Sequence, residues 1–123
     1  MMHVSKEFYK SLGLPFRIVN IVSGELNDAA CQKLDLEAWY PSQKRYRELV
    51  SVSNCTDYQS RLLKVQYMGD QNQTKFPHML NGTLIAVQRT MTCLVENYFR
   101  GSYIEVPQVL QKYMGKERIE RRK

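Results

Sequence analysis

The segment 83–99 (TLIAVQRTMTCLVENYF) constrains the fold of this chain more than any other stretch. Its large apolar residues recur with the period of an α-helix, at Leu84, Val87, Met91, Leu94, Val95 and Tyr98. The opposite side of the same helix carries the small apolar residues Ala86 and Cys93. Because a helix that is apolar nearly all round must be covered on several sides, the segment predicts a long buried helix.

Before this helix the sequence has the patterns of β-strands. Segment 16–22 (FRIVNIV) is an almost continuous apolar run, which is typical of a strand buried on both faces. Segments 33–40 and 46–53 also have strand patterns, and the short link 41–45 predicts that they pair as an antiparallel hairpin. Further short strands are predicted at 63–67, 76–80 and 104–106.

Two further helices are predicted. Val4, Phe8 and Leu12 form the apolar stripe of the first, and a proline at the start marks the second at 107–114. Shorter helical turns are expected at 27–31 and 54–61. This order predicts an α+β fold with a mainly antiparallel β-sheet and the long buried helix packed on it. Neither a glycine-rich dinucleotide motif nor a P-loop is present.

Composition places the chain among ordinary globular proteins. With 123 residues, 43% hydrophobic and 24% charged, it has about the length of one domain. No apolar run approaches the roughly 20 residues of a membrane span, and the first residues lack the apolar core of a signal peptide. The cysteines (Cys31, Cys55 and Cys93) and histidines (His3 and His78) do not have zinc-ligand spacing, so no zinc site is predicted.

The net charge of +6 is concentrated at the C-terminus. Segment 116–123 (KERIERRK) contains five basic and two acidic residues, so half of the net charge lies in these eight positions. We expect one domain over 1–115, followed by a basic, disordered tail over 116–123. The alternative is that the tail makes sequence-independent contacts with the phosphates of RNA.

Arg89 is the only charged residue between Thr83 and Val95. A guanidinium that is buried without a partner costs much free energy, so a buried helix requires Arg89 to be paired. One alternative is an ion pair with Glu96 or with a carboxylate on a strand. The other is a cavity in which the arginine binds a phosphate or carboxylate group of a ligand. The residues alone favour neither alternative.

Glu48 is a second candidate site residue. In a regular strand it shares a face with Tyr46 and Val50, so we expect its carboxylate to point to the apolar interior. Arg89 or a hard cation such as Mg²⁺ could pair with it there. Ser51 lies three residues further on and faces the opposite side of a flat strand. Joint use of Glu48 and Ser51 therefore requires a β-bulge, or the end of the strand near Ser51.

The junction 80–83 (LNGT) precedes the predicted helix. Asn81 or Thr83 can cap the N-terminus of the helix, and Gly82 eases the turn. Free N–H groups at a helix N-terminus also form an anion site, and Arg89 would lie about 9 Å further along the axis. Together these donors could contact two parts of one extended anionic ligand. No pair of a nucleophile and a base is evident.

These same residues lie in stretches that resemble a known family. The stretches are 12–17 (LGLPFR), 33–39 (KLDLEAW), 46–61 (YRELVSVSNCTDYQSR), 78–90 (HMLNGTLIAVQRT), 96–98, 106–110 and 113–115. In this order they are similar to the C-terminal part of the catalytic domain of seryl-tRNA synthetases, which are class II aminoacyl-tRNA synthetases. The segment around Arg89 resembles motif 3 of that family, and Arg89 resembles its invariant arginine.

The resemblance implies roles for individual residues. The ATP-binding set would comprise Glu48, Leu49, Val50, Ser51 and Arg89. Glu48 and Arg89 would be catalytic, because Arg89 would contact the γ-phosphate of ATP. Glu48 and Ser51 would hold Mg²⁺ together with ATP. Asn81 and Thr83 would line the serine pocket, where a hydroxyl-bonding site can discriminate strongly between substrates.

The resemblance also implies an activity and partners. Members of the family use ATP and Mg²⁺ to activate L-serine as seryl-adenylate, and then transfer the seryl group to tRNA(Ser). We expect the full-length protein to be a cytoplasmic homodimer with no membrane partner. Motifs 1 and 2 have no counterpart in the 123 residues, so we expect the chain alone to be inactive and to self-associate. Two other classes remain open: a non-catalytic binding or regulatory module derived from a synthetase, and a small basic RNA-binding protein.

Overall fold

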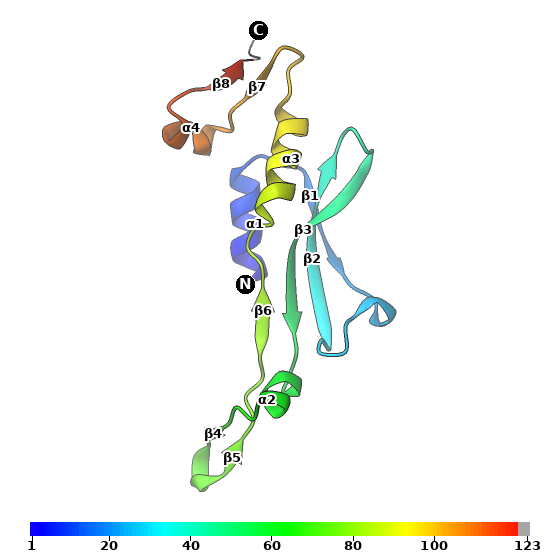
Figure 1. Cartoon of the computed structure of the whole chain (residues 1–123), viewed down its shortest axis with the longest axis vertical. Coiled ribbons are helices and arrows are strands. Elements are labelled where there is room, and N and C mark those ends of the chain that lie inside the picture. The colour runs from blue at the N-terminus through cyan, green and yellow to red at the C-terminus, as the bar shows by residue number, and fades with distance from the viewer. Residues whose placement is uncertain (121–123) are drawn as a thin grey trace.

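The computed structural model describes residues 1–120 of the chain. Its centre is a four-stranded antiparallel sheet in the order β1 (Phe16–Asn20), β2 (Gln32–Tyr40), β3 (Arg45–Asn54) and β6 (Leu80–Gly82). Helices α1 (Met2–Ser11) and α3 (Val87–Tyr98) lie side by side against one face of this sheet (Figure 1). The predicted α+β class with a mainly antiparallel sheet is confirmed, as is the hairpin of β2 and β3.

Smaller elements extend the two ends of the sheet. At one end, α2 (Tyr58–Leu63) leads into a short hairpin of β4 (Tyr67–Met68) and β5 (Thr74–Lys75), which projects away from the core (Figure 1). At the other end, β7 (Tyr103–Glu105) pairs with β8 (Arg118–Glu120), and α4 (Gln108–Met114) lies between them in the chain. Two 3-10 turns occupy Ser23–Glu25 and Asp70–Asn72.

The hydrophobic core lies between the sheet and the two helices. Its buried members are Tyr9, Leu12, Leu14, Leu36, Ala38, Tyr40, Leu49, Val50 and Cys93. Inside it, the hydroxyls of Tyr9 and Thr90 form a hydrogen bond of 2.9 Å that joins α1 to α3. Since buried polar groups need partners, this bond makes the two hydroxyls compatible with an apolar interior.

Helix α1 ends at Ser11, and the glycine that the sequence indicates follows its C-cap Leu12. Gly13 has a φ of +68°, and a Cβ built there would lie 2.5 Å from the hydroxyl oxygen of Tyr98. That hydroxyl donates a hydrogen bond of 2.6 Å to the carbonyl of Leu12, so the last turn of α3 is fastened to the end of α1. The buried side of α1 is rotated from the predicted stripe, because Tyr9 is buried and Val4 is exposed.

Strand β3 contains a β-bulge at Leu49. Leu36 of β2 pairs with Val50, but the next residue of β2, Glu37, pairs with Glu48, so Leu49 is the extra residue. Leu49 and Val50 are both fully buried, although neighbours in a regular strand point to opposite faces. The bulge therefore directs two consecutive side chains into the core.

The bulge decides which polar side chains share a face. Glu48 and Ser51 would point to opposite faces of a flat strand, and the extra residue between them reverses the alternation. Their partners on β2 are Glu37 and Asp35, which alternate regularly and so lie on one face. The bulge that joint use of Glu48 and Ser51 requires is thus present in β3.

Some strand predictions are wrong. Segment 16–22 is not buried on both faces, because β1 lies at the edge of the sheet and Ile18 is 37% exposed. The run 63–67 is divided between the end of α2 and the two-residue strand β4. The strand expected at 76–80 starts only at Leu80. Before it, the carbonyl of Pro77 accepts a hydrogen bond from the Ser60 hydroxyl, which holds this stretch against α2 rather than in the sheet.

The expected helical turn at 27–31 is present as a single hydrogen-bonded turn over 27–30, in which the N–H of Ala30 donates to the carbonyl of Asn27 at 3.1 Å. The side chain of Asn27 accepts hydrogen bonds from the N–H groups of Ala29 and Ala30, at 3.1 and 3.0 Å. A side-chain oxygen that accepts from the N–H groups two and three residues further on is the arrangement of a cap, and here it closes one turn that does not continue as a helix. The chain therefore turns here and enters β2 at Gln32.

Helix α3 differs from its prediction in two ways. It starts at Val87 and not at Thr83, because residues 83–86 continue along the edge of β3. The predicted capping by Asn81 or Thr83 is therefore wrong, and Ala86 is the N-cap. The burial of the helix is also only partial: its buried residues are Thr90 and Cys93, whereas Val87, Met91 and Val95 are exposed within the described part of the chain.

The basic C-terminal segment is partly ordered. Arg118–Glu120 form β8 and pair with β7, so the prediction of a disordered tail is wrong for these residues. Residues 121–123 of the predicted tail lie outside the described residues. Within residues 1–120, none of the helices has the length and apolar character needed to cross a bilayer.

We predict that Leu36→Ala lowers the free energy of unfolding by about 2–5 kcal/mol, because Leu36 is fully buried at the centre of the core and its truncation leaves a cavity. Urea unfolding followed by circular dichroism measures the change. The control is Leu62→Ala, since Leu62 is 69% exposed on α2 and should change stability by less than about 0.5 kcal/mol. Equal losses in the two variants would contradict this core.

Burial raises the pKa of two groups in the core, Cys93 on α3 and Tyr40 on β2. The pKa of the Cys93 thiol rises from 9.0 to about 11, chiefly because burial disfavours the thiolate, and Glu96 adds to the effect. Burial likewise raises the pKa of Tyr40 from 10.0 to about 12. The folded chain therefore holds these two protons at pH values at which the unfolded chain has released them.

We predict that the free energy of unfolding falls as pH rises from about 9 to about 12, since over this range the unfolded chain binds fewer protons than the folded chain. Tyr40→Phe should flatten the upper part of this fall. It should also cost about 1 kcal/mol at neutral pH through its lost hydrogen bond. Denaturant unfolding at stepped pH measures both effects, with Tyr58→Phe at an exposed position as the control. A flat profile for the native chain would contradict the prediction.

Candidate functional site

The face of the sheet that points away from α1 and α3 is mostly polar. The strand register places six polar residues on it: Lys33, Asp35 and Glu37 of β2 and Glu48, Ser51 and Ser53 of β3. We call these six residues the polar face. It exists because polar residues alternate with the core residues of β2, and because the bulge brings Glu48 to the same side as the two serines.

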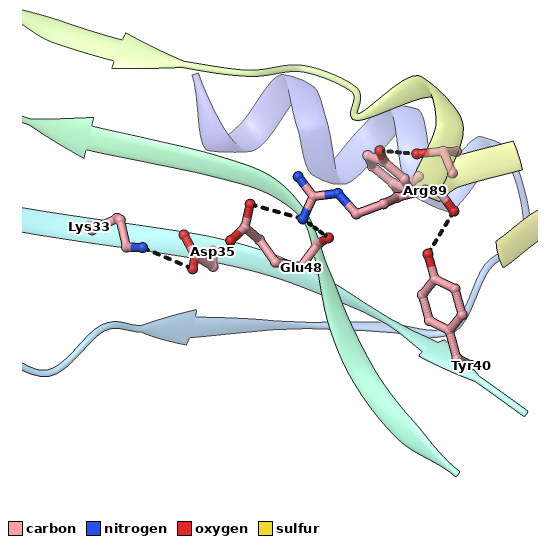
Figure 2. Close-up of polar contacts among 7 residues, drawn as sticks. Lys33, Asp35, Tyr40, Glu48 and Arg89 are labelled. Atoms are coloured by element: carbon pink, nitrogen blue, oxygen red, sulfur yellow. Dashed lines mark hydrogen bonds and ion pairs between the residues drawn. The ribbon is translucent and has the colours of Figure 1, made fainter. Parts of the chain in front are cut away.

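Arg89 contacts the polar face from the first turn of α3 (Figure 2). Its Nη1 donates to the backbone carbonyl of Glu48 at 2.8 Å and lies 3.4 Å from Glu48 Oε1. The alternative in which Arg89 pairs with a strand carboxylate is therefore confirmed. Glu96 is not its partner and instead accepts a hydrogen bond from the N–H of Ser42.

The surroundings of this pair differ from the prediction. The side chains of Arg89 and Glu48 are 47% and 37% exposed, so neither is buried in the apolar interior. The bulge at Leu49 is the reason for Glu48, because it turns that side chain to the polar face. An exposed pair of this kind adds little to stability, so the arginine is available to another anion.

The backbone that carries Arg89 is held from two sides. The hydroxyl of Tyr40 donates a hydrogen bond of 2.6 Å to the carbonyl of Arg89 (Figure 2). The next residue, Thr90, is buried and bonded to Tyr9. Just before the helix, the N–H of Ala86 donates to the carbonyl of Leu49 at 3.1 Å. The guanidinium thus extends from a fixed backbone toward the polar face.

Asn81 and Thr83 lie along the free edge of the sheet, beside β3. Asn81 pairs with Ser53 in the register, and its amide nitrogen lies 3.4 Å from the sulfur of Cys55. The N–H of Thr83 donates to the carbonyl of Ser51 at 3.0 Å, which continues the ladder by one residue. The structure therefore brings these predicted serine-binding residues next to the strand positions of the predicted ATP site.

Two of the predicted ATP-binding residues do not present their side chains to the polar face. Leu49 and Val50 are fully buried in the core on the opposite side. Any contact that they make with a ligand would have to come from their backbone groups. Their part in the site is to form the bulge that orients Glu48 and Ser51.

Asp35 is a residue of the polar face that was not predicted from the sequence. This carboxylate is only 4% exposed, and its Oδ1 is a buried oxygen without a hydrogen-bond partner among residues 1–120. Its Oδ2 lies 3.5 Å from Lys33 Nζ (Figure 2). Asp35 is the direct cross-strand partner of Ser51. The alternation of segment 33–40 together with the hairpin register could have identified it, because both place it on the polar face.

The arrangement suits an anionic ligand that carries a hard cation. Arg89 offers guanidinium N–H donors, which suit phosphate oxygens. Glu48 and Ser51 offer a carboxylate and a hydroxyl on one face, the oxygen ligands that Mg²⁺ prefers. The unpartnered oxygen of Asp35, on the strand next to Ser51, is compatible with such a cation, since it could accept a hydrogen bond from one of the groups that bind the cation. Residues 1–120 hold no group of three His, Cys, Asp or Glu side chains for a metal, so the bound ligand would have to supply further oxygens.

The sequence matches a protein-family model described as "tRNA synthetase class II core domain (G, H, P, S and T)" over residues 1–98. Among curated proteins, it is 55% identical over 120 residues to the cytoplasmic serine–tRNA ligase of Arabidopsis thaliana, covering 95% of this chain and 27% of that protein. It is 57% identical over 121 residues to the cytoplasmic serine–tRNA ligase of Saccharomyces cerevisiae, covering 95% and 26%.

Solved structures agree with the sequence matches. The cytoplasmic serine–tRNA ligase of Naegleria fowleri, in complex with AMP, superposes with a TM-score of 0.91 at 54% identity, over 100% of this chain and 29% of that chain. The seryl-tRNA synthetase of Pyrococcus horikoshii, complexed with ATP, gives 0.93 at 36% identity, over 99% and 28%. The chain thus spans about a quarter of the length of these relatives. Because the family model matches well over half of it, the chain belongs to the class II tRNA synthetase core-domain family.

Proposed function

We propose that this chain forms the C-terminal part of the catalytic domain of a serine–tRNA ligase. The full-length protein would activate L-serine with ATP to seryl-adenylate and transfer the seryl group to tRNA(Ser). The observation that carries the proposal is the contact of Arg89 with Glu48 at the polar face, beside Ser51. This contact lies in a chain that is 55% and 57% identical in sequence to the cytoplasmic serine–tRNA ligases of Arabidopsis thaliana and Saccharomyces cerevisiae.

ATP with Mg²⁺ is the proposed cofactor, and zinc has no part in the proposal. Related structures were solved with AMP and ATP, which supports a nucleotide site in the full-length protein. Arg89 would bind the γ-phosphate, while Glu48 and Ser51 would hold the cation. The segment from Leu49 to Val50 would contribute backbone groups, since its side chains are buried.

The proposed chemistry needs no enzyme nucleophile. An oxygen of the serine carboxylate attacks the α-phosphorus of ATP, the bond from that phosphorus to the bridging oxygen breaks, and pyrophosphate leaves. Positioning the reactants and stabilising the phosphate charge then supply the acceleration. Arg89 suits this role because its backbone is fixed and its guanidinium is accessible. Mg²⁺, when bound, would supply additional positive charge to the phosphates.

Asn81 and Thr83 are the proposed serine-binding residues. Both lie exposed at the sheet edge next to the strand that carries Ser51, so a small substrate there would be close to the proposed nucleotide site. A hydroxyl on Thr83 could bond to the serine hydroxyl, which penalises an analogue that lacks this group. The homodimeric state and the cytoplasmic location of the full-length protein belong to the same proposal. The location is supported by relatives named as cytoplasmic.

We predict that Arg89→Ala in the full-length protein lowers serine-dependent exchange of pyrophosphate into ATP by about 10²–10³-fold, because a preorganised donor to the phosphates is lost. The control is Arg61→Ala, since Arg61 also forms an exposed pair with a carboxylate, that of Asp57, but lies on α2. The 123-residue chain alone should show no exchange. Full activity of the Arg89 variant would contradict its role, and exchange by the chain alone would contradict the proposed inactivity.

We predict that the chain alone self-associates through the exposed side of α3. Val87, Met91 and Val95 are each about half exposed along this side, and exposed apolar patches favour association. Light scattering at increasing concentration should give a mass above that of a monomer. The double change Met91→Glu and Val95→Lys should lower that mass, whereas Thr92→Lys, at an exposed polar position of the same helix, should not. A monomeric native chain at high concentration would contradict the prediction.

A further inference from the structure

Asp35 is the most conspicuous polar residue that the proposed function leaves without a role. A carboxylate that is almost fully buried needs partners for its oxygens, and an unsatisfied one costs free energy. Lys33 satisfies Oδ2 only at the long distance of 3.5 Å, and Oδ1 has no hydrogen-bond partner in the part of the chain that the structure describes. The folded chain therefore keeps a buried acceptor unused at the polar face.

The position of Asp35 relative to Ser51 gives this acceptor a possible donor. The two residues are direct partners in the antiparallel register of β2 and β3 and lie on the same face. The Cβ atoms of such a pair are about 4.5–5.5 Å apart. A serine hydroxyl has three staggered orientations, so a rotation about χ1 can bring it to the carboxylate of its cross-strand neighbour.

Cation binding by Ser51 would create the need for this contact. A hydroxyl that coordinates a cation directs a lone pair to the metal, and its O–H must then point elsewhere. An O–H at a partly buried site needs an acceptor, and second-shell acceptors of this kind orient metal ligands. Oδ1 of Asp35 is an unused acceptor directly across the strand pair from Ser51.

The other charged groups on this face are already engaged. Glu37 is bonded to Arg17 at 2.7 Å, and Glu48 is in contact with Arg89. Lys33 lies on the other side of Asp35, where it offsets the carboxylate charge through Oδ2. A direct role as a cation ligand is less consistent with the structure, since Oδ1 is not accessible. Contact through Ser51 requires no such access.

We propose that Asp35 is a positioning residue that accepts a hydrogen bond from the Ser51 hydroxyl and so directs its lone pairs to the divalent cation bound with ATP. This inference rests on the proposed function, because it assumes that Glu48 and Ser51 hold that cation. It assigns to Asp35 an effect on the metal-dependent part of ATP binding alone.

The test measures the Kd of ATP for the full-length protein by calorimetry, once with Mg²⁺ and once with EDTA. The Kd in EDTA divided by the Kd with Mg²⁺ measures how much the metal strengthens ATP binding. Asp35→Leu keeps the shape of the side chain but removes both acceptors, and it should lower this ratio about 10–100-fold while leaving the Kd in EDTA unchanged. Asp35→Asn keeps one acceptor oxygen and should retain most of the ratio. Asp57→Leu, at a carboxylate on the approach to α2, is the control and should change neither value.

A double-mutant cycle shows whether Asp35 acts through Ser51. In the Ser51→Ala background, Asp35→Leu should have no further effect on the ratio, because the hydroxyl that it orients is gone. Thermal unfolding of each variant confirms that it folds, and if Asp35→Leu does not fold, Asp35→Asn in both backgrounds provides the same comparison with a smaller effect. An unchanged ratio in folded Asp35→Leu, no measurable decrease in Asp35→Asn where only that variant folds, or a full effect of Asp35 without the Ser51 hydroxyl, would overturn the inference.

The same measurements separate this inference from the proposed function. If Glu48→Gln lowers the ratio and the Asp35 variants do not, the cation site stands and only the role of Asp35 fails. If the unmodified protein binds ATP equally with Mg²⁺ and with EDTA, or does not bind it, the proposed function fails and the inference fails with it.

Discussion

The β-bulge at Leu49 is the local constraint on which the site depends. It adds one residue to β3, directs two consecutive apolar side chains into the core, and turns Glu48 to the same side as Ser51. The extra residue of the bulge, Leu49, also fills the core with its side chain, so core packing and the geometry of the site are coupled. A regular β3 would place Glu48 among apolar residues without a partner, at a large desolvation cost.

A second constraint follows from the path of the chain after β6. Residues 83–86 continue along the edge of β3 before α3 begins. Backbone hydrogen bonds from Thr83 and Ala86 hold them there. This extension moves the start of the helix toward the bulge, so that Arg89 in its first turn reaches the carbonyl of Glu48. Had the helix begun at Thr83, Arg89 would lie in its second turn. The extended edge and the bulge therefore bring together residues that are 41 positions apart in the chain.

The sequence predicted elements that follow from the local pattern of residues. It did not predict features, such as the position of a strand in the sheet, that depend on tertiary contacts. The hairpin of β2 and β3 and the turn at Gly13 follow from alternation and turn chemistry. The edge position of β1 could not be read from its apolar run, because periodicity does not reveal how many neighbours a strand has. The need for a bulge was predictable from the spacing of Glu48 and Ser51 once their joint use was assumed. The orphaned oxygen of Asp35 was not, because the number of partners of a buried atom depends on packing in three dimensions.

The paired attachment of α3 at Arg89 and Thr90 limits how a ligand can alter this region. One residue is held through its carbonyl by Tyr40 and the next through its side chain by Tyr9, so a shift of the helix would break one partly buried and one buried hydrogen bond. Only the arginine side chain remains free to adapt, and immobilising one such side chain costs about 2 kcal/mol or less of conformational entropy. If Arg89 binds a phosphate group as proposed, its side chain would change rotamer on a backbone that folding has already fixed, so α3 itself would need little further ordering.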